Sequence, residues 1–160
     1  MKIKSFVIRS TSKAFTLIEL MLVILMISIL AATALGMYKT YILRAKTTEA
    51  VQGVSKLTTG EVEYYSKNTT FLAVGPINFP PVANKRVVDF TVDPNWAHLT
   101  FNFTDPIQFS YQTTVTATNS VDCEAQGDLN GDGITSIFRR TVSFASSFTV
   151  GSLYVFDELE

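Results

Sequence analysis

The sequence predicts an α+β chain, in which a long N-terminal α-helix with a protruding hydrophobic half packs on an antiparallel β-sheet of about four strands. Three observations support this fold class. An apolar stretch without any charge runs from Leu20 to Tyr38. Apolar residues then recur at spacings of three and four as far as Lys67, which is typical of one helix face. From Arg86 onward apolar and polar residues alternate, which is typical of strands with one buried face.

The helix is expected to cover residues 15–67, because no proline occurs before Pro76. Residues 15–38 alone would form a helix of about 36 Å, enough to cross a bilayer core of roughly 30 Å. The segment before it, residues 1–14, is basic and free of acids, which favours retention of the N-terminus in the cytoplasm. The basic residues of that segment are Lys2, Lys4, Arg9 and Lys13.

Two ordinary explanations fit the apolar stretch. It is typical of a simple membrane anchor, and it is also typical of a secretory signal peptide cut after Ala34, since Ala32-Thr33-Ala34 is a small-x-small site. Neither explains Glu19, a lone carboxylate at the head of the stretch. Because an ionisable group in a membrane segment is unfavourable, it is a functional hypothesis by default.

Residues 14–20, Ala-Phe-Thr-Leu-Ile-Glu-Leu, followed by the apolar run, resemble the class III signal of type IV pilins and the related pseudopilins. The resemblance implies the pilin fold, with a leader over residues 1–14. It also implies cleavage between Ala14 and Phe15 by a membrane-embedded prepilin peptidase, and N-methylation of Phe15. Glu19 would then pair with the terminal amine of a neighbouring subunit.

The same resemblance implies the partners and the location of the protein. Copies of the chain would assemble into a helical filament on an inner-membrane platform driven by a cytoplasmic ATPase. The prepilin would sit in the inner membrane, and the filament would be an extracellular pilus or a periplasmic pseudopilus. Two positions depart from the family pattern: Ala14 replaces the usual glycine, and Gly36 replaces a common proline.

The rest of the chain, residues 68–160, is expected to form a globular β head. Residues 68–85 are rich in Pro, Gly and Asn and are expected to be a loop. Strands are expected at 88–92, at 99–104 and 107–111 as a hairpin turning at Asp105-Pro106, and at 137–145 and 148–156. The expected core aromatics are Phe101, Phe103, Phe109, Tyr111, Phe144 and Phe148.

Two further details concern packing in the head. Gly53 and Gly60 lie seven residues apart on one helix face, a spacing that would allow close backbone approach, but we favour the alternative that they are ordinary weak points of the helix. Cys123 is the single cysteine, so no intrachain disulfide can form, and a buried thiol in the core is the expected role.

The one local motif that suggests ligand chemistry is Asp128-Leu-Asn130-Gly-Asp132-Gly133. Its oxygen-bearing side chains match the first half of an EF-hand calcium loop, although the twelfth position is Arg139 instead of glutamate. A structural Ca²⁺ would therefore need more donors. The candidates are the side chains of Asp122, Glu124 and Ser136 and the carbonyl of Ile134. The alternative is a bare turn, since Asn-Gly and Asp-Gly are strong turn signals.

Three functions remain open at this point. The favoured hypothesis is a structural subunit of a type IV pilus, and the second is a pseudopilin of a type II secretion system. The third is an exported calcium-dependent binding module that begins at Leu35. No enzyme is expected, because one histidine, one cysteine and no nucleophile-elbow pattern offer no catalytic group. No cofactor is expected to be required, and a structural Ca²⁺ is the one candidate. The sequence shows no basic face that would suggest a nucleic-acid partner.

Overall fold

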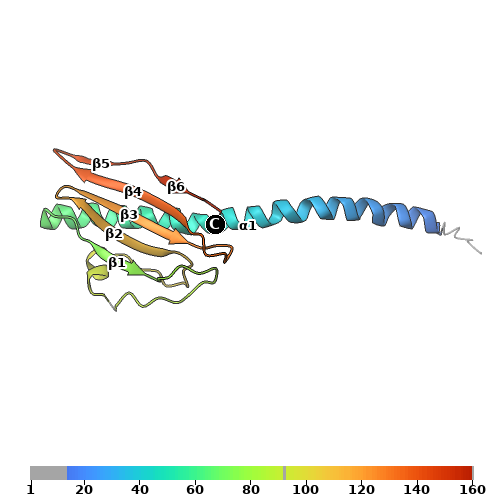
Figure 1. Cartoon of the computed structure of the whole chain (residues 1–160), viewed down its shortest axis with the longest axis horizontal. Coiled ribbons are helices and arrows are strands. Elements are labelled where there is room, and N and C mark those ends of the chain that lie inside the picture. The colour runs from blue at the N-terminus through green and yellow to red at the C-terminus, as the bar shows by residue number, and fades with distance from the viewer. Residues whose placement is uncertain (1–13, 92, 160) are drawn as a thin grey trace, which may run out of the picture. The chain divides into compact units, whose positions relative to one another are not determined.

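The computed structural model describes residues 14–91 and 93–159, and the chain divides between Lys39 and Thr40 into two units. Residues 1–13 of the expected leader, including its four basic residues, lie outside the described residues. Helix α1 (Leu17–Asn68) runs through both units (Figure 1). The long helix expected over residues 15–67 is therefore confirmed within one or two residues at each end.

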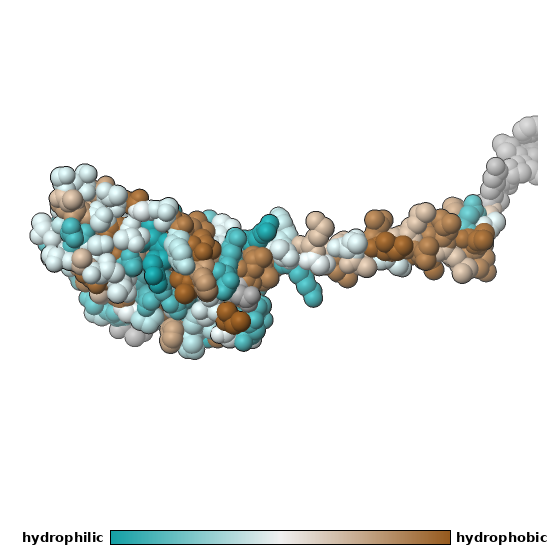
Figure 2. Space-filling view, turned by 45° about the horizontal axis from the view of Figure 1, so that its top comes forward, coloured by the Kyte–Doolittle hydropathy of each residue, from teal (hydrophilic) through white to brown (hydrophobic). Residues whose placement is uncertain are grey.

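The described part of the first unit is helical from Leu17 onward, and its side chains are exposed. The large apolar residues from Phe15 to Tyr38 are between 42% and 78% exposed. Figure 2 shows that hydrophobic residues dominate the surface of this segment. A helix that is apolar on every side requires lipid or other helices around it, because water solvates it poorly.

The second unit contains a six-stranded antiparallel sheet instead of the expected four strands, with the strand order β1-β2-β3-β4-β5 and β6 also paired to β4 (Figure 1). The strands are β1 (Val74–Ile77), β2 (Ser110–Ala117), β3 (Ser120–Gly127), β4 (Ser136–Phe144), β5 (Phe148–Val150) and β6 (Tyr154–Phe156). A short helix, α2 (Asn95–His98), precedes β2. The α+β class and the helix-on-sheet arrangement are confirmed.

The core of the second unit lies between α1 and the sheet. Ala50, Val54 and Leu57 of α1 are fully buried in one cluster with residues of β2, β3 and β4. The expected core aromatics all belong to this cluster. Phe101, Phe109 and Tyr111 are buried, and Phe103, Phe144 and Phe148 are half-buried against them. Cys123 is also buried, as expected, and burial raises the pKa of its thiol to about 12.

The prediction of a β-hairpin over residues 99–111 is wrong. Residues 101–109 form no strand, apart from one isolated bridge between Arg86 and Ile107. The physical reason lies on α1. Glu49 Oε1 accepts the backbone N–H groups of Gln108 (2.7 Å) and Phe109 (3.2 Å), which therefore donate to a side chain instead of to a neighbouring strand. The alternating aromatics fill the core from an irregular segment.

Other strand boundaries also differ from expectation. Residues 88–91 form no strand, since Asp89 accepts hydrogen bonds from the backbone N–H and the hydroxyl of Thr91 in a local turn, and Val92 lies outside the described residues. Strand β1 lies inside the expected loop 68–85, and the central hairpin β2–β3 was missed. The expected strand 148–156 is two short strands that share β4 as partner. The strand expected at 137–145 is confirmed as β4.

Gly53 and Gly60 are not ordinary weak points of α1. A Cβ atom at Gly53 would lie 2.1 Å from the Tyr111 ring, and one at Gly60 would lie 2.3 Å from the carbonyl oxygen of Leu99. These contacts are shorter than any real Cβ contact, so both glycines allow the helix to approach the head closely. The expectation of weak points is corrected accordingly.

Candidate functional site

The first candidate site is the start of α1. Thr16 precedes the first helical residue, and its hydroxyl accepts the backbone N–H of Glu19 (3.3 Å). In return, Glu19 Oε2 accepts the backbone N–H of Thr16 (3.0 Å) and its hydroxyl (2.8 Å). This reciprocal pair is a capping box, which satisfies amide donors that the first turn of a helix leaves free. Glu19 therefore has an intramolecular role that the sequence motif alone did not reveal.

The two residues before the cap, Ala14 and Phe15, are exposed and precede the helix. The structure thus leaves the expected processing position outside regular structure.

The polar side chains within the apolar segment are satisfied by the helix itself. The hydroxyl of Ser28 donates to the carbonyl of Ile24 (2.6 Å), and that of Thr33 donates to the carbonyl of Leu30 (2.9 Å). Such bonds let a hydroxyl enter hydrocarbon without an unpaired donor. By length and composition α1 can cross a membrane, and none of the apolar window is buried by the described residues.

A capped, acid-bearing start, an exposed apolar segment and an α+β head are the features that the resemblance to type IV pilins implies. The family model that matches the chain is the prokaryotic N-terminal methylation motif, over residues 9–35. This match confirms the resemblance to type IV pilins and pseudopilins.

Curated proteins similar to the chain are fibre proteins. Fimbrial protein EcpC of Eikenella corrodens is 44% identical over 59 residues, which cover 37% of this chain and 39% of that protein. A fimbrial protein of Pseudomonas aeruginosa is 53% identical over 47 residues, covering 29% and 30% of the two chains. Type IV major pilin protein PilE1 of Neisseria gonorrhoeae is 47% identical over 53 residues, covering 33% and 32%. No solved structure matches.

The chain therefore spans only about a third of the length of the relatives that it matches. The similarity supports a pilin-like N-terminal segment, since the family model matches residues 9–35.

The second candidate site is the loop between β3 and β4. Asp128 is buried, and its two carboxylate oxygens accept the backbone N–H groups of Gly131 (2.6 Å) and Gly133 (3.2 Å). Both glycines have positive φ angles, 83° and 91°, which permit this turn. Asn130 Oδ1 accepts the N–H of Asp132 (2.8 Å), and Asp132 Oδ1 accepts the N–H of Ile134 (2.8 Å). The loop is closed by its own side chains.

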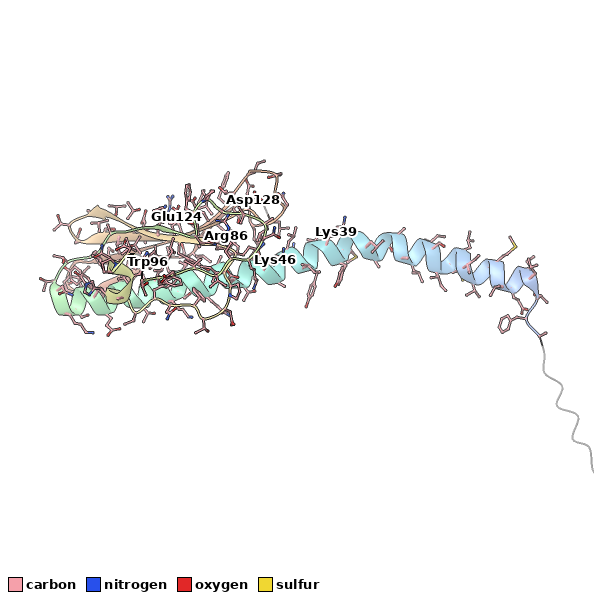
Figure 3. The ribbon with its side chains drawn as sticks, turned by 90° about the horizontal axis from the view of Figure 1, so that it is seen from below. Lys39, Lys46, Arg86, Trp96, Glu124 and Asp128 are labelled. Atoms are coloured by element: carbon pink, nitrogen blue, oxygen red, sulfur yellow. The ribbon has the colours of Figure 1, made fainter. Side chains whose placement is uncertain are left out.

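The additional donors expected for calcium are engaged elsewhere. Glu124 Oε2 accepts Arg139 Nη2 and Nε, both at 2.6 Å, and this hydrogen bonding raises the pKa of Arg139. Asp122 Oδ1 accepts the Thr141 hydroxyl (2.6 Å), and the Ser136 hydroxyl donates to the Gly127 carbonyl (3.1 Å). In Figure 3 the labelled side chains of Asp128 and Glu124 lie apart.

The residues of this loop do not form a full calcium shell. Asp128 and Asp132 are its two carboxylates, whereas a Ca²⁺ site takes six to eight oxygens. Across residues 14–91 and 93–159, no group of three or more His, Cys, Asp or Glu side chains could hold a metal ion. The observed contacts are those of a self-supporting turn, and the structural Ca²⁺ stays a prediction.

The sequence analysis did not identify the structural roles of two acidic residues on α1, Glu49 and Glu61. Glu49 contacts Lys85 Nζ at 3.6 Å in addition to its two backbone donors, and Glu61 is fully buried. For Glu61, the spacing along the helix was a signal of burial. Glu61 lies three and four residues after Thr58 and Leu57, on the apolar face, so its burial was predictable from the 3.6-residue period.

Proposed function

We propose that this chain is a prepilin, a structural subunit that is cleaved between Ala14 and Phe15, methylated at Phe15 and assembled into a type IV pilus. The observation that carries the proposal is the position of the acid. Glu19 stands at the capped start of an exposed, membrane-length apolar helix, five residues into the mature chain. After cleavage, the Phe15 amine would be a cation at the same membrane depth as this anion, and pairing makes two such charges tolerable.

Residues 15–38 would hold the subunit in the inner membrane and would later form the filament core. The head would become the outer surface of the filament. The partners would be further copies of the chain, the prepilin peptidase, the assembly platform and its ATPase. An enzymatic role has no support, and the names of the similar proteins are those of fibre subunits.

A pseudopilin of a type II secretion system is the alternative. The N-terminal methylation motif does not separate the two, since the resemblance covers both classes. The names of the similar proteins favour a pilus. The exported binding module that begins at Leu35 would require that Glu19 and its cap have no function.

N-terminal sequencing and intact mass of the chain recovered from cells test the proposal. We expect a chain that starts at Phe15 and carries one added methyl group. The matched variant is Ala14→Gly, which restores the usual residue of the family and should give the same N-terminus with less unprocessed precursor. A start at Leu35 would support the exported module, and recovery of unprocessed chain alone would contradict prepilin processing.

We also propose that no metal is required for the head to fold. The loop at Asp128 is closed by backbone donors, and we expect millimolar CaCl₂ to leave the thermal midpoint of the full chain in detergent unchanged relative to EDTA. Isothermal titration should show no saturable heat. A calcium-dependent rise in the midpoint that Asp132→Asn abolishes would instead establish the structural calcium site.

A further inference from the structure

The strongest unexplained feature of the head is a buried carboxyl group at the junction of α1, the segment that follows it and the sheet. Glu61 has no exposed surface. Its Oε2 accepts the backbone N–H of Leu72 (3.1 Å). Oε1 is buried and has no hydrogen-bond partner. One oxygen of a fully buried acid is therefore unsatisfied.

The surrounding bonds show that this acid tethers three elements. Thr113 of β2 donates its hydroxyl to the Leu72 carbonyl (2.8 Å) and accepts the backbone N–H of Val74 (3.0 Å), the first residue of β1. Glu61 completes this network from α1. The segment between α1 and β1 is thus held by the carboxyl group of Glu61, and no cation pairs with this group.

The groups that face Glu61 give it little electrostatic compensation. On β3, Cys123 is buried and its thiol is neutral, since nearby Glu61 adds to the burial that raises the pKa of this thiol. On β4, Arg140 pairs across from Cys123, and its Nε is buried without a hydrogen-bond partner. Among the described residues, no basic nitrogen lies within 4 Å of the Glu61 carboxyl group. Asp122 and Thr141 bond each other away from this site.

Two other carboxylates of the second unit, Glu49 and Glu124, have their negative charge balanced by a cation and by hydrogen-bond donors. Glu49 has Lys85 and two backbone donors, and Glu124 has Arg139 and two glutamine amides. A buried carboxylate without such partners is unfavourable when charged, whereas its protonated form avoids that desolvation penalty. Glu61 therefore differs from Glu49 and Glu124 in having no cationic partner within 4 Å among the described residues.

We propose that Glu61 is a proton-binding switch of the head: the folded chain holds its carboxyl group neutral, and ionising it weakens the junction between α1, β1 and β2. Burial raises the pKa of Glu61 to about 7 from 4.5. Because the folded-state value is the higher one, the stabilisation is fully present below pH 4.5 and is lost as the pH rises through 7.

The test is thermal and chemical unfolding of the full chain in detergent at pH 5 and at pH 8. The folding equilibrium constant should fall by on the order of 10- to 100-fold over this range in the wild type, relative to Glu61→Gln. Glu63→Gln is the matched control, because it removes the same charge two residues away on the exposed side of the same helix, where Glu63 pairs with Lys67. It should keep the pH dependence of the wild type. Parallel profiles for wild type and Glu61→Gln would overturn the proposal.

A direct readout covers the case in which Glu61→Gln does not fold. Infrared difference spectra of the wild type should show the C=O band of a protonated carboxylic acid at pH 5 that disappears on titration to pH 8. The Glu63→Gln variant should retain this band, since Glu63 is exposed. The absence of a protonated carboxyl band at pH 5 in the folded wild type would also overturn the proposal.

Discussion

Replacing Gly60 with alanine should destabilise the head by about 2 to 3 kcal/mol, the range expected for overpacking a closed core. The added Cβ would lie 2.3 Å from the Leu99 carbonyl oxygen. Leu99 is fully buried at the end of α2, beside Trp96 and Phe101 of the core, so this backbone cannot retreat without disturbing them. The clash exceeds the gain of about 1 kcal/mol that alanine brings to a helix interior.

The measurement is the midpoint of thermal unfolding by circular dichroism, with the full chain in detergent. A loss of this size should lower the midpoint by on the order of 10 °C. Gly36→Ala is the matched control, since it makes the same substitution in the same helix at a position where a Cβ would meet nothing within 4 Å. It should leave the unfolding of the head unchanged. Equal midpoints for the two variants would show that α1 does not approach Leu99 as described.

Replacing Glu19 with glutamine should abolish filament assembly while leaving the helix intact. Glutamine can still accept the hydrogen bonds of Thr16, because a capping box tolerates Glu or Gln at this position. What it removes is the negative charge. If the charge pairs with the Phe15 amine of a neighbouring copy, that pair is lost and a buried cation remains without a partner, which costs about 3 to 5 kcal/mol per contact.

Thr16→Ala makes the opposite change, since it removes the hydroxyl of the cap and keeps the charge. Loss of such a cap costs about 1 kcal/mol, so filaments should still form. The measurement is the yield of sheared filaments, alongside the amount of processed subunit in the membrane. Normal filaments from Glu19→Gln, or their loss from Thr16→Ala with Glu19 intact, would show that the acid acts through the cap and not through charge pairing.

The start of the chain was predictable because its signals are local. Residues 14–20 form a contiguous motif, and the apolar run behind them needs no distant partner to become a helix, since each hydrogen bond closes within four residues. The exposure of the residues from Phe15 to Tyr38 follows from composition as well. The same holds for β4, whose alternating pattern is continuous in sequence.

The head was predicted less well because distant residues supply its hydrogen bonds. The run at 99–111 alternates as a hairpin would, yet Glu49, 59 residues before Gln108, takes the backbone donors that a strand partner would need. Strand β1 forms because Thr113, 39 residues away, holds the backbone of Val74. The sequence offers Asp122 and Glu124 as extra donors for the DLNGDG loop, and only the structure pairs them with Thr141 and Arg139.

Sequence alone therefore settles the helix, its membrane-length apolar half, the acid at its start and the α+β class, because short-range hydrogen bonding and hydrophobicity decide each of them. The close approach at Gly53 and Gly60, the bonds from Gln108 and Phe109 to Glu49, and the buried carboxyl group of Glu61 arise only when the chain has folded. Each depends on contacts between segments far apart in sequence, and spacing along the chain does not specify which segments meet.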